Sequence, residues 1–371
     1  MDKSANKKYF IGMQILRAFA FMGVFLIHVT WVQPVFACWS ITVFLMLSGF
    51  LNVLHGYEKN ISYDFKSSIK YGVKKVKNIY PLHLLMLFFA FLLYVFSFRS
   101  EIMVDFKEQV VILALRLLSN IFLLSDWGPK SGWFYNVFSE YNIVTWYLSL
   151  SLLLFILSPV LMAFMHRLYD RNDSKKKSIN PWLVIFVTYV ITVIVNMIFV
   201  ATFGKSGSFL YTYECPLSRI GDYFIAMQMG YIYMQRDKVD DKDEATKWIS
   251  VLAATSLISI FLISISASGL LGEENWISKT GFYFTIPVAG LIYATAKLED
   301  RITENWIVKI LATLGALSQY AYLIHVPIIN LIHGVYKRVT DVNVIVWGLL
   351  SFVITMMLSV VTSKIKKKRT V

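Results

Sequence analysis

Two ionisable side chains, Arg17 and His28, stand in one apolar stretch near the N-terminus, LRAFAFMGVFLIH. In an α-helix this spacing amounts to three turns plus about 20°, so both residues lie on one face, about 16 Å apart along the axis. A guanidinium binds anions and an imidazole exchanges protons near neutral pH. Together they predict the two ends of a polar passage. The simpler alternatives are an arginine that reaches water at the helix end and a hydrogen-bonded core histidine.

Two further residues could support proton transfer. His325 stands in SQYAYLIHVPIIN, two residues before Pro327, which interrupts the hydrogen bonding of a helix. Irregular backbone inside a membrane is tolerated beside protein or a cavity, so we expect a cavity near His325. Asp222, in SRIGDYF, is expected at a depth similar to that of His28. It either orients an imidazole or pairs with Arg219 at the surface.

The composition defines what must position these residues. Of 371 residues, 57% are hydrophobic and 16% are charged, with a mean hydropathy of +0.59. Soluble domains are nearer 45–50% apolar and about 25% charged, so a water-soluble enzyme, a disordered chain and a disulfide scaffold are excluded. The sequence predicts an all-α polytopic membrane bundle. Its net charge of +13 indicates topology-setting loops and not nucleic-acid binding.

About ten apolar segments approach the length of a membrane span. They are residues 11–32, 36–54, 81–98, 144–168, 181–203, 220–234, 248–271, 280–296, 315–336 and 344–362. We take the first as a span and not as a cleaved signal peptide. With both termini cytoplasmic and residues 106–124 not crossing, most Lys and Arg fall on the inner side. Residues 106–124 are therefore expected to form an outer amphipathic or re-entrant helix, with Gln109, Arg116 and Asn120 on one face.

Several other segments could contribute to a site. The inner segment 55–80 contains Lys75 and Lys77, which either set topology or bind an anionic headgroup or a phosphorylated cofactor. Gly49, beside Ser48, permits close helix packing. The aromatic pair at residues 146–147 is by default part of an interfacial belt. Cys38 and Cys215 lack metal-ligand neighbours, and their spacing cannot show whether they pair.

The order and spacing of five motifs resemble those of the acyltransferase 3 family of bacterial membrane O-acyltransferases. These motifs are Arg17-x10-His28, Ser48-Gly49-Phe50, KNIYP at residues 77–81, Trp146-Tyr147-Leu148, and residues 318–327. Two features depart from the family: no glutamate follows the tryptophan motif, and the short tail after the last span resembles members without an appended extracytoplasmic domain.

The resemblance implies transfer of an acyl group, usually acetyl, from cytoplasmic acyl-CoA to a hydroxyl of an envelope glycan or glycolipid. It implies a multi-pass protein of the bacterial cytoplasmic membrane that needs no metal. His28 is expected to be the general base, with His325 and Asp222 in support. The other expected site residues are Arg17, Ser48, Lys75, Lys77 and Tyr80 for acetyl-CoA, and Trp146 and Tyr147 for the acceptor.

A transporter of a polar metabolite or a lipid-linked sugar is the competing interpretation, because intramembrane charges and broken helices also occur there. A transporter leaves the mass of its substrate unchanged, whereas an acetyltransferase adds an acetyl group. The sequence leaves open the acceptor, the acyl group, direct or ping-pong transfer, and the oligomeric state.

Overall fold

The computed structural model describes residues 10–57, 62–104, 106–125, 127–128, 132–169, 179–235, 242–271, 276–336 and 343–370. These residues form helices and no strand, which confirms the all-α prediction. The helices are α1 (Ile11–His28), α2 (Val35–Gly56), α3 (Phe65–Val76), α4 (Tyr80–Ser97), α5 (Arg99–Val104), α6 (Phe106–Ile121), α7 (Gly132–Val137), η1 (Ile143–Thr145), α8 (Trp146–Tyr169), α9 (Pro181–Gly207), α10 (Phe209–Tyr213), α11 (Pro216–Met234), α12 (Lys242–Ala267), η2 (Trp276–Lys279), α13 (Phe282–Lys297), η3 (Glu299–Arg301), α14 (Trp306–Tyr336) and α15 (Val344–Thr370).

Eight helical segments of the described chain are long and apolar enough to cross a membrane: α1, α2, α4, α8 with η1, α9, α12, α14 and α15. This confirms a polytopic membrane protein. The predicted spans 220–234 and 280–296 also coincide with helices, α11 and α13, which fall outside this set. The α13 helix has only 16 residues, and α11 contains Arg219, Asp222 and Gln228. The ten crossings and their orientation remain predictions.

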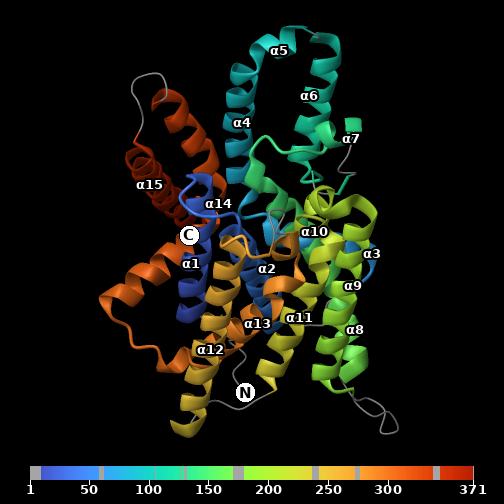
Figure 1. The fold of residues 1–371 in the computed structure, drawn as a ribbon, viewed down its shortest axis with the longest axis vertical. Coiled ribbons are helices and arrows are strands. Elements are labelled where there is room, and N and C mark those ends of the chain that lie inside the picture. Colours follow the sequence, from blue (N-terminus) through green and yellow to red (C-terminus); the bar gives the residue numbers. More distant parts are fainter. Residues whose placement is uncertain are drawn as a thin grey trace.

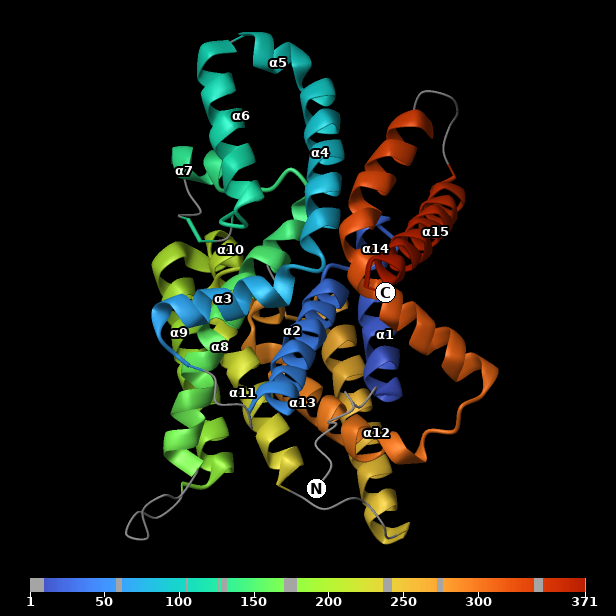
Figure 2. The same ribbon diagram turned by 180° about the vertical axis from the view of Figure 1, so that it is seen from behind.

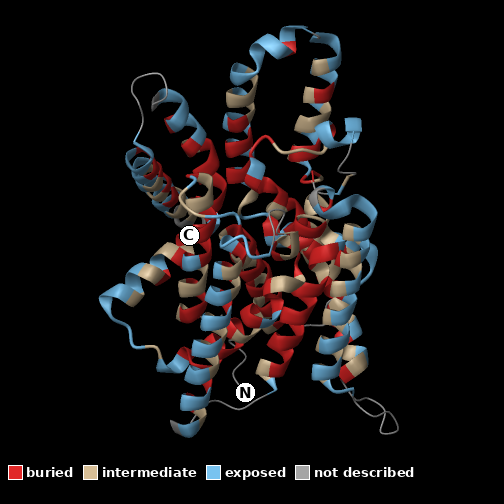
Figure 3. Ribbon diagram, viewed as in Figure 1, coloured by how far each residue is buried: buried red, intermediate tan, exposed pale blue. Residues whose placement is uncertain are grey.

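Burial inside the protein explains how α11 can contain the polar residues Arg219, Asp222 and Gln228. Most of its residues are buried, and it packs against α2, α9 and α13. Protein therefore surrounds its polar side chains where lipid would otherwise be. Figure 3 shows the buried residues gathered along the central helices, while the outer helices are largely exposed.

Residues 106–124, which are predicted not to cross the membrane, form α6 and the turn after it. They belong to a projection at one end of the molecule. The α4 helix runs out from the bundle, α5 makes the turn, and α6 returns beside it (Figure 1). Viewed from behind, α3 crosses the middle of the molecule beside α8, and α14 changes direction along its length (Figure 2).

Gly49 provides the close approach of α2 to α11. A Cβ atom at this position would lie 2.4 Å from the backbone oxygen of Tyr223, closer than real contacts allow. We expect Gly49→Ala to lower the free energy of unfolding by about 1–3 kcal/mol, because backbone atoms must shift to make room. Thermal unfolding of the purified protein in detergent measures this.

Gly334 on α14 provides the matched control. A Cβ atom there would meet nothing within 4 Å. We expect Gly334→Ala to leave the thermal midpoint unchanged or to raise it slightly, because alanine favours the helix. Equal midpoints for the Gly49→Ala protein and the unaltered protein would contradict the packing assigned to the α2–α11 contact.

Candidate active site

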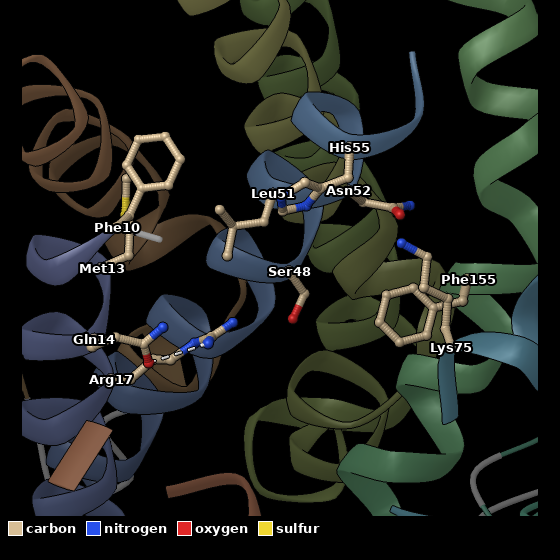
Figure 4. Close-up of a pocket in the computed structure, with 10 residues that line it drawn as sticks. All are labelled: Phe10, Met13, Gln14, Arg17, Ser48, Leu51, Asn52, His55, Lys75 and Phe155. Carbon is tan, nitrogen blue, oxygen red and sulfur yellow. Dashed lines mark hydrogen bonds between the residues drawn. The ribbon is translucent and has the colours of Figure 1, made fainter. Parts of the chain in front are cut away.

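The site begins with two adjoining cavities of about 340 and about 270 Å³ that share Arg17, Ser48, Lys75 and Phe155. Figure 4 shows the first cavity, where residues of α1, α2, α3 and α8 face one another. Segments that lie far apart in sequence thus bring together three of the residues predicted to bind the donor: Arg17, Ser48 and Lys75. We call the two cavities together the basic cavity.

Helical spacing explains why polar groups gather on the walls contributed by α1 and α2. Gln14 precedes Arg17 by one turn, and its Oε1 accepts a hydrogen bond of 3.4 Å from Arg17 Nη1. Ser48, Asn52 and His55 follow one another at four and three residues, so they lie on one face of α2. Each helix therefore turns a polar stripe inward.

The α3 helix is attached to this polar stripe. The hydroxyl of Tyr71 donates a hydrogen bond of 2.6 Å to Oδ1 of Asn52, and Asn52 Nδ2 donates one of 2.9 Å to the hydroxyl oxygen of Tyr223. Burial raises the pKa of Tyr71 to about 12, so its hydroxyl keeps its proton and remains a donor at neutral pH. This chain of bonds fixes α3, and with it Lys75, against α2 and α11.

The second half of the basic cavity extends to α8, α14 and α15. Its lining includes Tyr147, Ser318, Tyr322 and Lys366. Arg17, Lys75 and Lys366 are the cations among the described lining residues of the two halves, and no carboxylate stands among them. Such a site attracts an anion, because the positive charges act together in a partly enclosed space.

A pair of imidazoles lies beyond Tyr322. The ring centroids of His28 and His325 are 5.1 Å apart, and that of Tyr322 lies 5.9 Å from His325. His325 is fully buried, and its Nδ1 donates a hydrogen bond of 3.2 Å to the backbone oxygen of Ala321. That bond leaves Nε2 as the unprotonated nitrogen of a neutral ring, and Nε2 has no hydrogen-bond partner in the described structure.

Close packing of α14 on α1 brings the two histidines together. A Cβ atom at Gly315 would lie 1.8 Å from the backbone oxygen of Gln14, so only glycine permits this approach. The rings of Phe21 and Phe25, both buried on α1, pack around His325. The basic cavity reaches Tyr322, but neither histidine lines it. Arg17 thus lines the basic cavity and His28 does not, so the passage that the sequence predicts between them stays a prediction.

Among the described residues, Asp222 contacts Arg219 and Thr285, and not an imidazole. Its Oδ2 is 3.2 Å from Arg219 Nη2, and its Oδ1 accepts a hydrogen bond of 2.5 Å from Thr285. Arg219 Nη2 also donates to Thr42 Oγ1 at 2.9 Å. The alternative pairing with Arg219 is the one present, in the core of the bundle and not at its surface. There it joins α11 to α2 and α13.

Three of the remaining predicted residues lie outside the basic cavity: Lys77, Tyr80 and Trp146. Trp146 is buried, with its ring centroid 5.1 Å from that of Tyr213. Tyr80 donates a hydrogen bond of 2.8 Å to the backbone oxygen of Ile121, and Lys77 is exposed. Tyr147, expected at the acceptor, instead lines the basic cavity with Arg17.

Sequence reasoning missed several residues of the basic cavity. Most of them stand one or two turns from a predicted residue, which is a signal that helical spacing offers; they are Gln14, Asn52, His55 and Ser151. Gln319 and Tyr322 fall inside the motif at residues 318–327 but were not singled out. Lys366 has no comparable signal, because its position depends on how α15 packs.

Two negative observations concern the described residues only. They contain no group of three or more His, Cys, Asp or Glu side chains that could hold a metal ion. No disulfide joins Cys38 and Cys215 in the described structure, and Cys38 is buried.

An all-α bundle of apolar helices, with a cation-lined cavity and two neighbouring imidazoles, defines a multi-pass integral membrane protein. The chain belongs to the acyltransferase 3 family, whose description is "Acyltransferase domain" and which matches residues 10–364. It is similar to the O-acetyltransferase OatA of Staphylococcus aureus (strain NCTC 8325 / PS 47), with 22% identity over 352 residues. The alignment covers 91% of this chain and 53% of OatA.

A second protein, from Staphylococcus aureus (strain COL) and provisionally named an O-acetyltransferase, is 21% identical over 356 residues. That alignment covers 90% of this chain and 53% of the relative. The chain thus spans about half the length of the curated relatives it matches. No solved structure matches the chain significantly.

Proposed function

We propose that the protein transfers an acyl group, most simply acetyl, from cytoplasmic acyl-CoA to a hydroxyl of a cell-envelope glycan or glycolipid. The observation that carries this proposal is the basic cavity beside the His28–His325 pair, in a chain of the acyltransferase 3 family. The names of its relatives support acetyl as the group and oxygen as the receiving atom. The bacterial cytoplasmic membrane is the proposed location, because acyl-CoA is available on its inner side.

The basic cavity is proposed to bind the phosphates of the donor. Phosphate oxygens accept charge-assisted hydrogen bonds from guanidinium and ammonium groups, and Arg17, Lys75 and Lys366 supply both kinds. The extended pantetheine arm would then run past Tyr147 and Tyr322 toward the histidines. Tyr322 lines the basic cavity and its ring centroid lies 5.9 Å from that of His325, so donor binding is proposed to include movement of this side chain.

His28 is proposed as the general base. It removes the proton from the acceptor hydroxyl while the oxygen attacks the thioester carbonyl; the new C–O bond forms, the C–S bond breaks, and the CoA sulfur leaves. The imidazolium then returns its proton to that sulfur, so charge and atoms balance. His325 lies close enough to His28 to stabilise this charge or to position the hydroxyl. A ping-pong route through an acyl-histidine uses the same residues.

The experiment that tests this proposal compares envelope glycans from cells with and without the gene by mass spectrometry. We expect one population of glycan to carry the added mass of an acyl group only when the gene is present. Purified protein incubated with acetyl-CoA and the unmodified glycan should reproduce the added mass and release the CoA thiol. Unchanged glycan masses combined with altered glycan export would support the transporter instead.

A further inference from the structure

A third cavity, of about 300 Å³, lies between α4, α14 and the loop before η1. We call it the outer cavity, because the predicted topology puts these ends of α4 and α14 outside. Its lining includes the aromatic side chains of Tyr94 and Tyr141 and the amides of Asn142 and Asn330. Tyr141 and Asn142 are buried, whereas Asn330 is exposed. The outer cavity therefore has a closed polar base and an open mouth.

The base of the outer cavity holds an unsatisfied hydrogen-bonding group. Asn142 is fully buried, and its Oδ1 has no hydrogen-bond partner in the described structure. Its Nδ2 donates a hydrogen bond of 2.9 Å to the backbone oxygen of Leu323. In a regular helix that oxygen would accept from residue 327, which is proline and has no N–H. Asn142 thus replaces the missing donor, while its own buried Oδ1 stays without a hydrogen-bond partner in the described structure.

The same helix connects the outer cavity to the histidines. Leu323 precedes His325 by two residues, which is about 3 Å along a helix axis. Val326 and Pro327, which follow His325, line the outer cavity, whereas Ser318 and Tyr322 line the basic cavity. The imidazole pair therefore lies between the two cavities along α14.

Side chains of α6 hold the loop that carries Asn142. Arg116 donates to the backbone oxygens of Ser139 and Glu140, and Asn120 Nδ2 donates to that of Ser139 at 2.8 Å. The guanidinium of Arg116 also lies over the ring of Tyr141, 4.4 Å from its centroid. Two residues of the predicted polar stripe thus hold the loop whose Tyr141 and Asn142 line the outer cavity.

We infer that the outer cavity binds the acceptor, and that it recognises one sugar residue of the glycan. Sugar hydroxyls donate to and accept from amide groups, and the C–H face of a sugar ring packs against aromatic rings. A buried carbonyl oxygen without a donor suits a hydroxyl, because leaving it unpaired costs free energy that a ligand recovers. This inference rests on the proposed function and places the acceptor away from Trp146 and Tyr147.

The test measures acyl transfer from acetyl-CoA to an envelope glycan fraction prepared from cells that lack the gene, with the full-length protein in lipid nanodiscs. We expect Asn330→Ala to raise the KM for this glycan about threefold to tenfold, the range for one lost hydrogen bond. The KM for acetyl-CoA should stay unchanged. Asn142→Ala should raise the glycan KM further, because it removes the buried oxygen at the base of the cavity.

Asn136→Ala is the matched control, since Asn136 is an exposed amide on α7 that lines none of these three cavities. It should leave both KM values unaltered. Should Asn142→Ala fail to fold, which loss of donor binding would reveal, Asn330→Ala still decides the question. Transfer with an unchanged glycan KM in Asn330→Ala overturns the acceptor site and leaves the transferase intact. Absence of transfer by the unaltered protein overturns the proposed function itself.

Discussion

Replacement of His28 by alanine should lower the kcat of acyl transfer by about 10²–10⁴-fold, the usual contribution of a general base. The KM for acetyl-CoA should change little, because His28 lies outside the basic cavity that is proposed to hold the donor phosphates. The measurement is CoA release by the purified variant at saturating donor and glycan. His166→Ala is the control, because His166 stacks on Tyr57 and lines none of the three cavities.

An assay with hydroxylamine as the acceptor in place of the glycan distinguishes two causes of lost activity in His28→Ala: loss of the general base and misfolding. Hydroxylamine attacks a thioester without prior removal of a proton, so its reaction should be much less sensitive to His28→Ala than transfer to a hydroxyl is. Equal losses with both acceptors would show that His28 does not act as the base. Full activity of His28→Ala together with an inactive His325→Ala would move that role to His325, whose Nε2 has no partner in the described structure.

The sequence predicted the helices and much of the basic cavity for the same physical reason. Polar residues are costly in apolar spans, and helical periodicity determines which of them share a face. Arg17 can be recognised in this way, whereas Ser48 and Tyr147 are singled out by motifs that resemble those of the family. The structure places all three around one cavity, although Tyr147 is expected at the acceptor. The membrane environment thus makes polar residues within spans conspicuous in the sequence.

The sequence could not predict contacts that depend on how helices rotate against one another. Asp222 was expected at the depth of His28, but depth does not select a partner, and its carboxylate instead binds Arg219 and Thr285. The aromatic rings that pack around His325 are equally hidden from the sequence, because a shared helix face does not reveal what packs against it.

Asn142 illustrates the other limit of sequence reasoning. It lies in a loop, where no periodicity indicates which way a side chain points, and its partner Leu323 is 181 residues away in the chain. Pro327 marked the place where α14 would need an external hydrogen-bond donor. Only the fold could show that Asn142 supplies it.

Arg17→Ala should raise the KM for acetyl-CoA about tenfold to a hundredfold, because hydrogen bonds to charged groups contribute about 1.5–3 kcal/mol. Its effect on kcat at saturating donor should be smaller, because the histidines lie outside the basic cavity. Arg17→Lys should recover part of the affinity, since an ammonium keeps the charge and loses the planar fork of donors. Initial rates over a range of acetyl-CoA concentrations measure both parameters. Lys309→Ala, an exposed cation on α14, serves as the control for lost surface charge.

A donor without phosphates distinguishes binding of the anion from a role in the chemistry. S-acetylpantetheine keeps the thioester and the pantetheine arm but lacks every phosphate that Arg17 is proposed to bind. The KM for this donor should be high for the unaltered protein and nearly the same for Arg17→Ala, because the variant has no phosphate contact left to lose. If Arg17→Ala instead lowers kcat equally with both donors, the guanidinium acts on the reacting thioester or on the packing of α1 against α14. The basic cavity would then need another ligand.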